Sequence, residues 1–382
     1  MASNQVIILA IDGGGIKGII PAYFLTQIEQ KTGKSCYQLF DIIGGTSTGG
    51  IIAAALTTIN PGNGQLPFSA ANLLNIYQCD GSKIFVAQNA DLHAKYYADD
   101  GNGNGIEPYL QNTVGDTLLS SAKNAIQALA GSRIIQMFTT GYTVNSTGYD
   151  ITNPILGQDF GPYLFNWYDA ANGTADDYCV WEAARGTSAA PSYFPIAYVG
   201  GNRSPRSGAS QRWIVDGGTM SNNPAVWALT EALRLGLAQS LSEITIISLG
   251  TGVYPGACGA GIHNNKAWDC PDNGDWSITP WMIENMIDLQ GYQTEGMLVN
   301  IILDAVQLVS ANQLTILQQG GLNYYRLEPV IPQSLSSMDN ISQENIDNLT
   351  AAATSYLSGD GSEIFADIIT ILEQSNVALK KN

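Results

Sequence analysis

Histidine is nearly absent from this sequence of 382 residues, which contains only His93 and His263. Cysteine is also scarce, and its five residues are Cys36, Cys79, Cys179, Cys258 and Cys270. No spacing of His and Cys matches a metal-ligand cluster, so we expect neither a metal nor a cofactor. The odd, scattered cysteines indicate reduced thiols, although Cys258 and Cys270 flank one loop and leave a disulfide open under oxidising conditions.

Basic residues are few, since 16 Lys and Arg stand against 33 Asp and Glu and give a net charge of −17. Binding of nucleic acid requires clustered Lys and Arg, so we expect no nucleic acid partner. The same balance disfavours anionic membranes, because acidic groups oppose the attraction of each basic residue. Any contact with a membrane surface would then use apolar and aromatic side chains.

Long apolar runs are missing as well, since none reaches the ~18 residues of a membrane span. No basic leader or cleavage site precedes the run VIILAI at Val6–Ile11, so we expect no signal peptide. These absences predict a cytoplasmic protein without an integral span. Peripheral membrane contact and export by another route stay open, and the sequence does not indicate an oligomeric state.

Three consecutive glycines, Gly13–Gly15, follow VIILAI and precede a segment with helical spacing. A glycine turn between strand and helix presents bare N–H groups and a positive helix end to an anion. Gly13, Gly15 and Gly18 fit the dinucleotide pattern G-x-G-x-x-G, but that fold needs an acidic residue at the end of the second strand. Glu29 lies inside the first helix instead, and no nucleotide phosphate-loop motif is present. An oxyanion formed during a reaction is the remaining candidate.

Residues 41–56 read DIIGGTSTGGIIAAAL and contain G-x-S-x-G between an apolar strand and an Ala-rich helix. This context is typical of a nucleophile elbow, in which Gly45 and Gly49 permit the sharp turn that presents Ser47. A glycine-rich turn that only caps a helix is the alternative. If the strands before Gly13 and Ser47 are parallel neighbours, their carboxyl ends meet at one sheet edge. The amides of Gly13, Gly14 and Gly15 would then form an oxyanion hole facing Ser47.

A base for Ser47 is found at Asp216, which ends the strand-like QRWIV and is followed by Gly217-Gly218 and a convincing helix. The order Ser47, Asp216, His263 also fits a triad, but His263 lies in a Gly/Asn-rich loop with no strand before it. We therefore expect a serine–aspartate pair, and exposed loop positions for both histidines.

The motifs DGGGIKG, GTSTG and DGG, in this order, resemble the patatin-like phospholipase family. The likeness extends to AARGTSAAPSYFP at Ala183–Pro195 and IISLGTG at Ile246–Gly252, and more loosely to KYYADDGNGNG from Lys95; it covers about Val6 to Gly252. The resemblance implies Ser47 as nucleophile, Asp216 as base and Gly13–Gly15 as oxyanion hole, without histidine or calcium. It further implies supporting positions at Lys17, Gly18, Gly45, Gly49, Gly217 and Gly218.

One α/β domain over residues 1–382 is expected, because 45% hydrophobic residues supply one large core and no linker divides the chain. The expected architecture is three-layer α/β/α, with a mostly parallel central sheet sandwiched by helices. Its core is placed at about 6–252, and a helical C-terminal portion at about 279–380 packs on it. Thr279–Gln319 predicts one or two helices, and Glu363–Leu379 an amphipathic helix packed on the sheet rather than in a membrane.

The function indicated is hydrolysis of glycerophospholipid, lysophospholipid or acylglycerol esters through an acyl-enzyme. An ordinary aspartate, with a pKa near ~3.9, is poorly matched to deprotonating an alcohol, so the oxyanion hole is expected to contribute strongly. Two other classes stay open: a catalytically weak lipid-binding or signalling module of the same fold, and a dinucleotide-binding oxidoreductase. The sequence does not indicate the acyl position, the headgroup or any activator.

Overall fold

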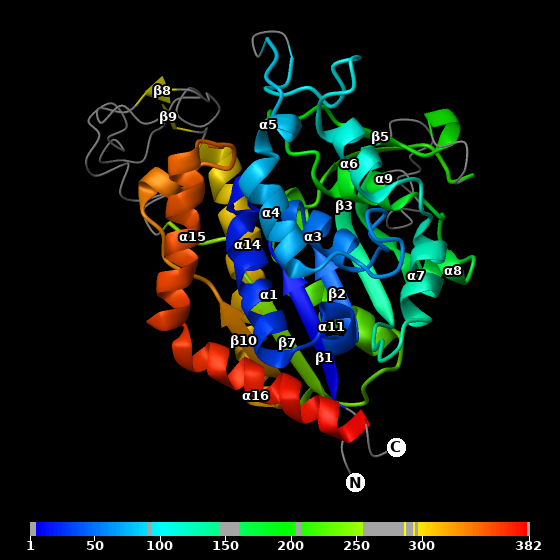
Figure 1. Ribbon diagram of the computed structural model, residues 1–382, viewed down its shortest axis with the longest axis vertical. Helices are drawn as coiled ribbons and strands as arrows, with labels where there is room; N and C mark the ends of the chain where they lie inside the picture. The colour runs from blue at the N-terminus through cyan, green and yellow to red at the C-terminus, as the bar shows by residue number, and fades with distance from the viewer. Residues whose placement is uncertain are drawn as a thin grey trace.

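An eight-stranded sheet with helices on both faces is the framework of the protein (Figure 1). The computed structural model describes residues 5–89, 93–144, 160–203, 208–254, 286–287, 293–294 and 297–379. The expectation of a mostly parallel sheet between two helical layers is confirmed. Cys258, Cys270 and His263 lie outside the described residues.

The strand order places the first strand near the middle of the sheet. Followed from one hydrogen-bonded neighbour to the next, the strands are β10 (Asn323–Leu327), β7 (Ile244–Leu249), β1 (Val6–Ile11), β2 (Ile42–Gly45), β3 (Gln136–Val144), β6 (Arg212–Asp216) and β5 (Ala197–Val199). The first five are mutually parallel, β6 is antiparallel to β3, and β5 is antiparallel to β6. β4 (Phe160–Asn166) also pairs antiparallel with β3.

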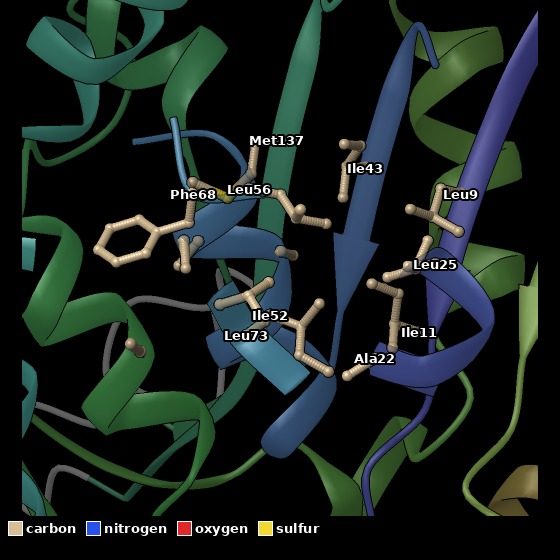
Figure 2. Close-up of a cluster of buried hydrophobic side chains, with 14 of the residues drawn as sticks. Leu9, Ile11, Ala22, Leu25, Ile43, Ile52, Leu56, Phe68, Leu73 and Met137 are labelled. Atoms are coloured by element: carbon tan, nitrogen blue, oxygen red, sulfur yellow. The ribbon is translucent and has the colours of Figure 1, made fainter. Parts of the chain in front are cut away.

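Side chains of β1 alternate between two apolar layers, as the pleat of a strand requires. Ile7, Leu9 and Ile11 join one buried cluster, while Val6, Ile8 and Ala10 join the other. All six are buried, which explains why this strand reads as a continuous apolar run. Figure 2 shows part of the first cluster, where Leu9 of β1 lies near Leu25 of a covering helix.

The helices that cover the first face come from both ends of the chain. They are α1 (Ile19–Thr32), α3 (Thr48–Leu56), α4 (Ala70–Cys79), α9 (Val180–Thr187), α15 (Gln343–Ser358) and α16 (Ser362–Leu379). On the other face lie α11 (Ala225–Arg234) and α14 (Met297–Leu317). Shorter or peripheral elements are α2 (Cys36–Leu39), α5 (Gly81–Ile84), α6 (Ile106–Val114), α7 (Leu119–Gln127), α8 (Trp167–Ala171), α10 (Gly218–Ser221) and the β8–β9 pair (Met286–Ile287, Gln293–Thr294).

The C-terminal portion combines expected helices with a strand that was not anticipated. The predicted amphipathic helix is confirmed as α16, whose Ile368 and Leu372 are fully buried in the core. Of the region predicted as helical from Thr279, α14 forms over Met297–Leu317. The segment NYYRL forms β10 and extends the sheet beside β7, so this portion is not purely helical. Within the described residues, no helix is both long and apolar enough to span a membrane.

Candidate active site

Two strands that share one edge of β3 bring the candidate nucleophile and base together. β2 pairs with the first part of β3 and ends with Gly45 opposite Thr139. β6 pairs with the later part of the same edge, runs in the opposite direction and ends with Asp216 opposite Gly141. The two strand ends therefore meet at neighbouring positions along β3, with only Thr140 between their pairing partners.

Ser47 occupies a strained turn between β2 and α3. Its backbone angles, φ 53° and ψ −123°, lie in a region that residues with a Cβ rarely adopt. Such a conformation costs ~1–3 kcal/mol and persists only where the surrounding structure enforces it. The Ser47 amide donates to Oγ1 of Thr187 at 2.9 Å, a contact that holds the turn.

The two glycines of the elbow allow the close packing that this turn requires. A Cβ on Gly49 would lie 2.7 Å from the carbonyl oxygen of Asp12, at the end of β1. A Cβ on Gly45 would lie 2.6 Å from the amide nitrogen of Gly50, in the first turn of α3. Both positions therefore exclude side chains, which agrees with their place in G-x-S-x-G.

The Ser47 hydroxyl donates to Oδ2 of Asp216 at 2.7 Å. The second oxygen of Asp216 accepts the Gly218 amide at 2.6 Å, so both oxygens of the carboxyl group are oriented. Asp216 is only 4% exposed, which removes competing water from this pair. Nucleophile, acceptor and orienting donor thus follow the arrangement of an activated serine.

Burial raises the pKa of Asp216 from 3.8 to about 7. Hydrogen bonds from Gly218 and Ser47 and the charge of the buried Arg185 oppose this rise in the pKa without cancelling it. A base is most effective when its pKa lies near the working pH. The mismatch expected for an ordinary aspartate is therefore much smaller in the folded protein.

The glycine turn after β1 is held by partners on both sides of the Gly13 peptide unit. The Gly13 amide donates to the carbonyl oxygen of Asn222 at 3.1 Å. The carbonyl oxygen of Gly13 accepts the hydroxyl of Thr251 at 2.8 Å. Because the Gly13 amide already donates to Asn222, it is less available to donate a hydrogen bond to an oxyanion than the sequence pattern suggested.

The next two amides of the turn have no such acceptor. Within the described residues, neither Gly14 N–H nor Gly15 N–H makes a hydrogen bond, whereas the following amide, of Ile16, donates to the carbonyl oxygen of Met338 at 2.8 Å. Anchors before and after the pair thus leave two adjacent donors unused. Since a Cβ on Gly13 would lie 3.0 Å from Cβ of Ser47, this turn adjoins the serine.

The remaining positions selected from the sequence support this arrangement. Gly217 packs against Thr140, because a Cβ there would lie 2.6 Å from the Thr140 carbonyl oxygen. Gly18 similarly approaches Tyr77, and Lys17 lies in the short 3-10 helix that follows Gly14.

His93 is exposed in a loop. Among the described residues, no group of three or more His, Cys, Asp and Glu could hold a metal ion.

Three contacts of the site had no individual signal in the sequence. Thr187 lies in the segment AARGTSAAPSYFP, which drew attention as a whole, but nothing marked this threonine. Asn222 follows the DGG motif by a few residues, and Thr251 lies inside the segment IISLGTG, where nothing marked it individually. Both are identified only by their hydrogen bonds to Gly13. A sequence pattern indicates the turn itself and does not indicate which neighbours anchor it.

The chain is similar to several known proteins. The family model described as patatin-like phospholipase matches residues 9–229. Patatin-17 of Solanum cardiophyllum is 28% identical over 384 aligned residues, covering 94% of this chain and 86% of its own. Probable inactive patatin-3-Kuras 1 of Solanum tuberosum is 29% identical, covering 73% and 69%. The crystal structure of VipD from Legionella pneumophila aligns with a TM-score of 0.39 at 12% identity, covering 92% of this chain and 67% of that one.

Proposed function

The chain belongs to the patatin-like phospholipase family, and on that premise we propose that it is a lipid acyl hydrolase that uses a Ser47–Asp216 dyad. The observation that carries the proposal is the 2.7 Å hydrogen bond from Ser47 Oγ to Asp216 Oδ2 beside two unused amides. The substrates would be glycerophospholipids, lysophospholipids or other acylglycerols. The scheme needs no calcium.

In the first half-reaction Ser47 Oγ attacks the ester carbonyl carbon and its proton passes to Asp216. The tetrahedral oxyanion accepts hydrogen bonds from the amides of Gly14 and Gly15. Each such donor typically stabilises the transition state by ~3–4 kcal/mol. The bond to the leaving alcohol then breaks, and the alcohol takes the proton from Asp216. In the second half-reaction water attacks the Ser47 acyl ester, Asp216 takes the proton of the water and returns it to Ser47, and a fatty acid leaves.

A long-chain fluorophosphonate and a panel of lipid esters test the proposal directly. We expect the wild-type protein to be labelled at Ser47 and to release fatty acid from at least one glycerolipid. Ser47→Ala should lose both activities, while Ser240→Ala, an exposed loop change, should keep them. A folded wild-type protein that is neither labelled nor active would favour the alternative of a non-catalytic lipid-binding module.

The pH dependence of hydrolysis should report the pKa of Asp216. Because the ionised form is the base, kcat/KM should rise with pH and level off above about 7. The measurement is kcat/KM for a soluble ester between pH 5 and 9. The midpoint should remain in Asp12→Asn, whatever its rate, because this change removes the second buried carboxyl group whose pKa burial raises to about 7 against the opposing charge of Arg326. A profile without a midpoint in this range would contradict Asp216 as the base.

A further inference from the structure

A chain of buried polar side chains leads from β10 to the Gly13 peptide unit, and its members lie far apart in the sequence. Its first link is Asn222, whose carbonyl oxygen accepts the Gly13 amide. The side chain of Asn222 is 8% exposed and donates through Nδ2 to Oε1 of Gln307 at 2.9 Å. Its Oδ1 lies against Gly13, where a Cβ would collide with it. The Asn222 side chain is thus packed between the glycine turn and α14.

Gln307 forms the second link and is also 8% exposed. Its Nε2 donates to Oε2 of Glu328 at 3.0 Å. A carboxylate accepts hydrogen bonds and cannot donate them, whereas an amide has one end of each kind. Glu328 therefore forces Gln307 to present its NH₂ group to the carboxylate and its oxygen to Asn222. Asn222 must in turn present its NH₂ group to Gln307 and its oxygen toward Gly13.

Glu328 is itself fixed on two sides. Its Oε1 accepts the Gly252 amide at 2.7 Å, and its Oε2 forms an ion pair with Arg326. Arg326 also donates to Oδ2 of Asp12 at 2.6 Å and to Oγ of Ser248 at 2.7 Å. Since Asp12 immediately precedes Gly13, the network reaches the glycine turn from both sides. Buried hydrogen bonds to charged groups are the stronger kind, which makes this anchor rigid.

We propose that Gln307 is a positioning residue: by transmitting the hydrogen-bond polarity of Glu328 to Asn222, it holds the Gly13 peptide unit in place and so directs the Gly14 and Gly15 amides at the oxyanion. The inference rests on the proposed function of the same site. Within the described residues, Gln307 makes no hydrogen bond to Ser47 or Asp216. Its effect on the glycine turn therefore passes through Asn222.

The experiment follows phosphonylation of Ser47 by a fluorophosphonate and separates the binding constant KI from the maximal rate constant kinact. Gln307→Met keeps the length of the side chain and removes both hydrogen bonds. We expect kinact to fall about tenfold, the loss typical of one or two hydrogen bonds, with KI within about twofold of the wild type. Gln313→Met, at an exposed position of the same helix, should behave as the wild type.

A second substitution tests the polarity itself. Gln307→Glu nearly keeps the shape of the side chain but replaces the donor facing Oε2 of Glu328 with an acceptor. It should lower kinact at least as much as Gln307→Met, because two acceptors then face each other. A packing role alone would tolerate this near-isosteric change.

Each outcome decides one point. Labelling of Gln307→Met at the wild-type kinact, a rise in KI alone, or a loss that only follows the melted fraction would overturn the positioning role. Labelling of Gln307→Glu at the wild-type kinact would overturn the polarity argument. A wild-type protein that is not labelled at Ser47 would instead overturn the proposed function, and the inference with it.

Discussion

We expect Asp216→Asn to lower ester hydrolysis by up to about four orders of magnitude, because general base catalysis by one side chain typically contributes ~10²–10⁴-fold. Asparagine keeps the size of the side chain and can still accept the Gly218 amide, but it cannot take the Ser47 proton. The measurement is steady-state hydrolysis of a lipid ester, with His93→Ala and His263→Ala as controls that should stay within about twofold of the wild type. A folded but inactive His263→Ala protein would replace the dyad with a triad.

The stability of the same variant separates loss of chemistry from loss of fold. The pKa of Asp216 is about 7 in the folded protein and 3.8 ordinarily, so the folded state binds the proton more tightly. The stabilising contribution of this group is complete below pH 3.8 and is lost as the pH rises to about 7. The amide introduced by the substitution is neutral at every pH, so the free energy needed to bury an ionised carboxylate above pH 7 no longer applies. Asp216→Asn should therefore melt no lower than the wild type at pH 8, and its melting temperature should depend less on pH.

The second large effect is expected from Gly14→Ala. A Cβ at this position would lie 2.7 Å from Cβ of Thr251 and would also meet the Thr251 hydroxyl, which holds the Gly13 carbonyl oxygen. The turn must shift, and the amides of Gly14 and Gly15 move out of line with the oxyanion. Loss of one such donor lowers kcat by roughly 10²–10³-fold. Binding of the substrate should change little, because these amides act on the oxyanion that forms only during the reaction.

Single-turnover acylation beside thermal melting distinguishes this effect from instability. Gly62→Ala is the matched control, because Gly62 lies in an exposed loop where a Cβ meets only the side chain of Asn60. A Gly14→Ala protein that melts early and acylates at the wild-type rate per folded molecule would show that Gly14 serves packing alone.

Sequence patterns indicated the chemistry of this site better than its construction. Ser47 and Asp216 were selected from local motifs, and in the structure they lie in hydrogen-bond contact. The direction of β6 was not predictable, because a strand ending in Asp-Gly-Gly reads the same whether it runs parallel or antiparallel to its neighbour. Only the pairing of β2 and β6 with one edge of β3 explains how two strand ends meet.

The residues that anchor the glycine turn were not predictable for a related reason. Gln307 and Asn222 are separated by 85 positions, and their contact depends on how α14 packs on the opposite face of the sheet. Glutamine on an apolar helix carries no local signal of a polar role. β10 was missed because the strand has only five residues and follows a long helix. Its partner β7 also lies 78 positions earlier in the sequence, so no local pattern joins the two strands.

The place of β7 and β10 in the sheet also dictates when activity can first appear during synthesis. β1 pairs with β2, which follows it closely, but its other edge stays open until β7 has been made. A ribosome adds ~5–20 residues each second, so a nascent chain spends seconds with Ser47 and Asp216 complete but without Arg326 and Glu328. Because these last two residues anchor the glycine turn, we expect the chain to gain full hydrolytic competence only after release of nearly its whole length.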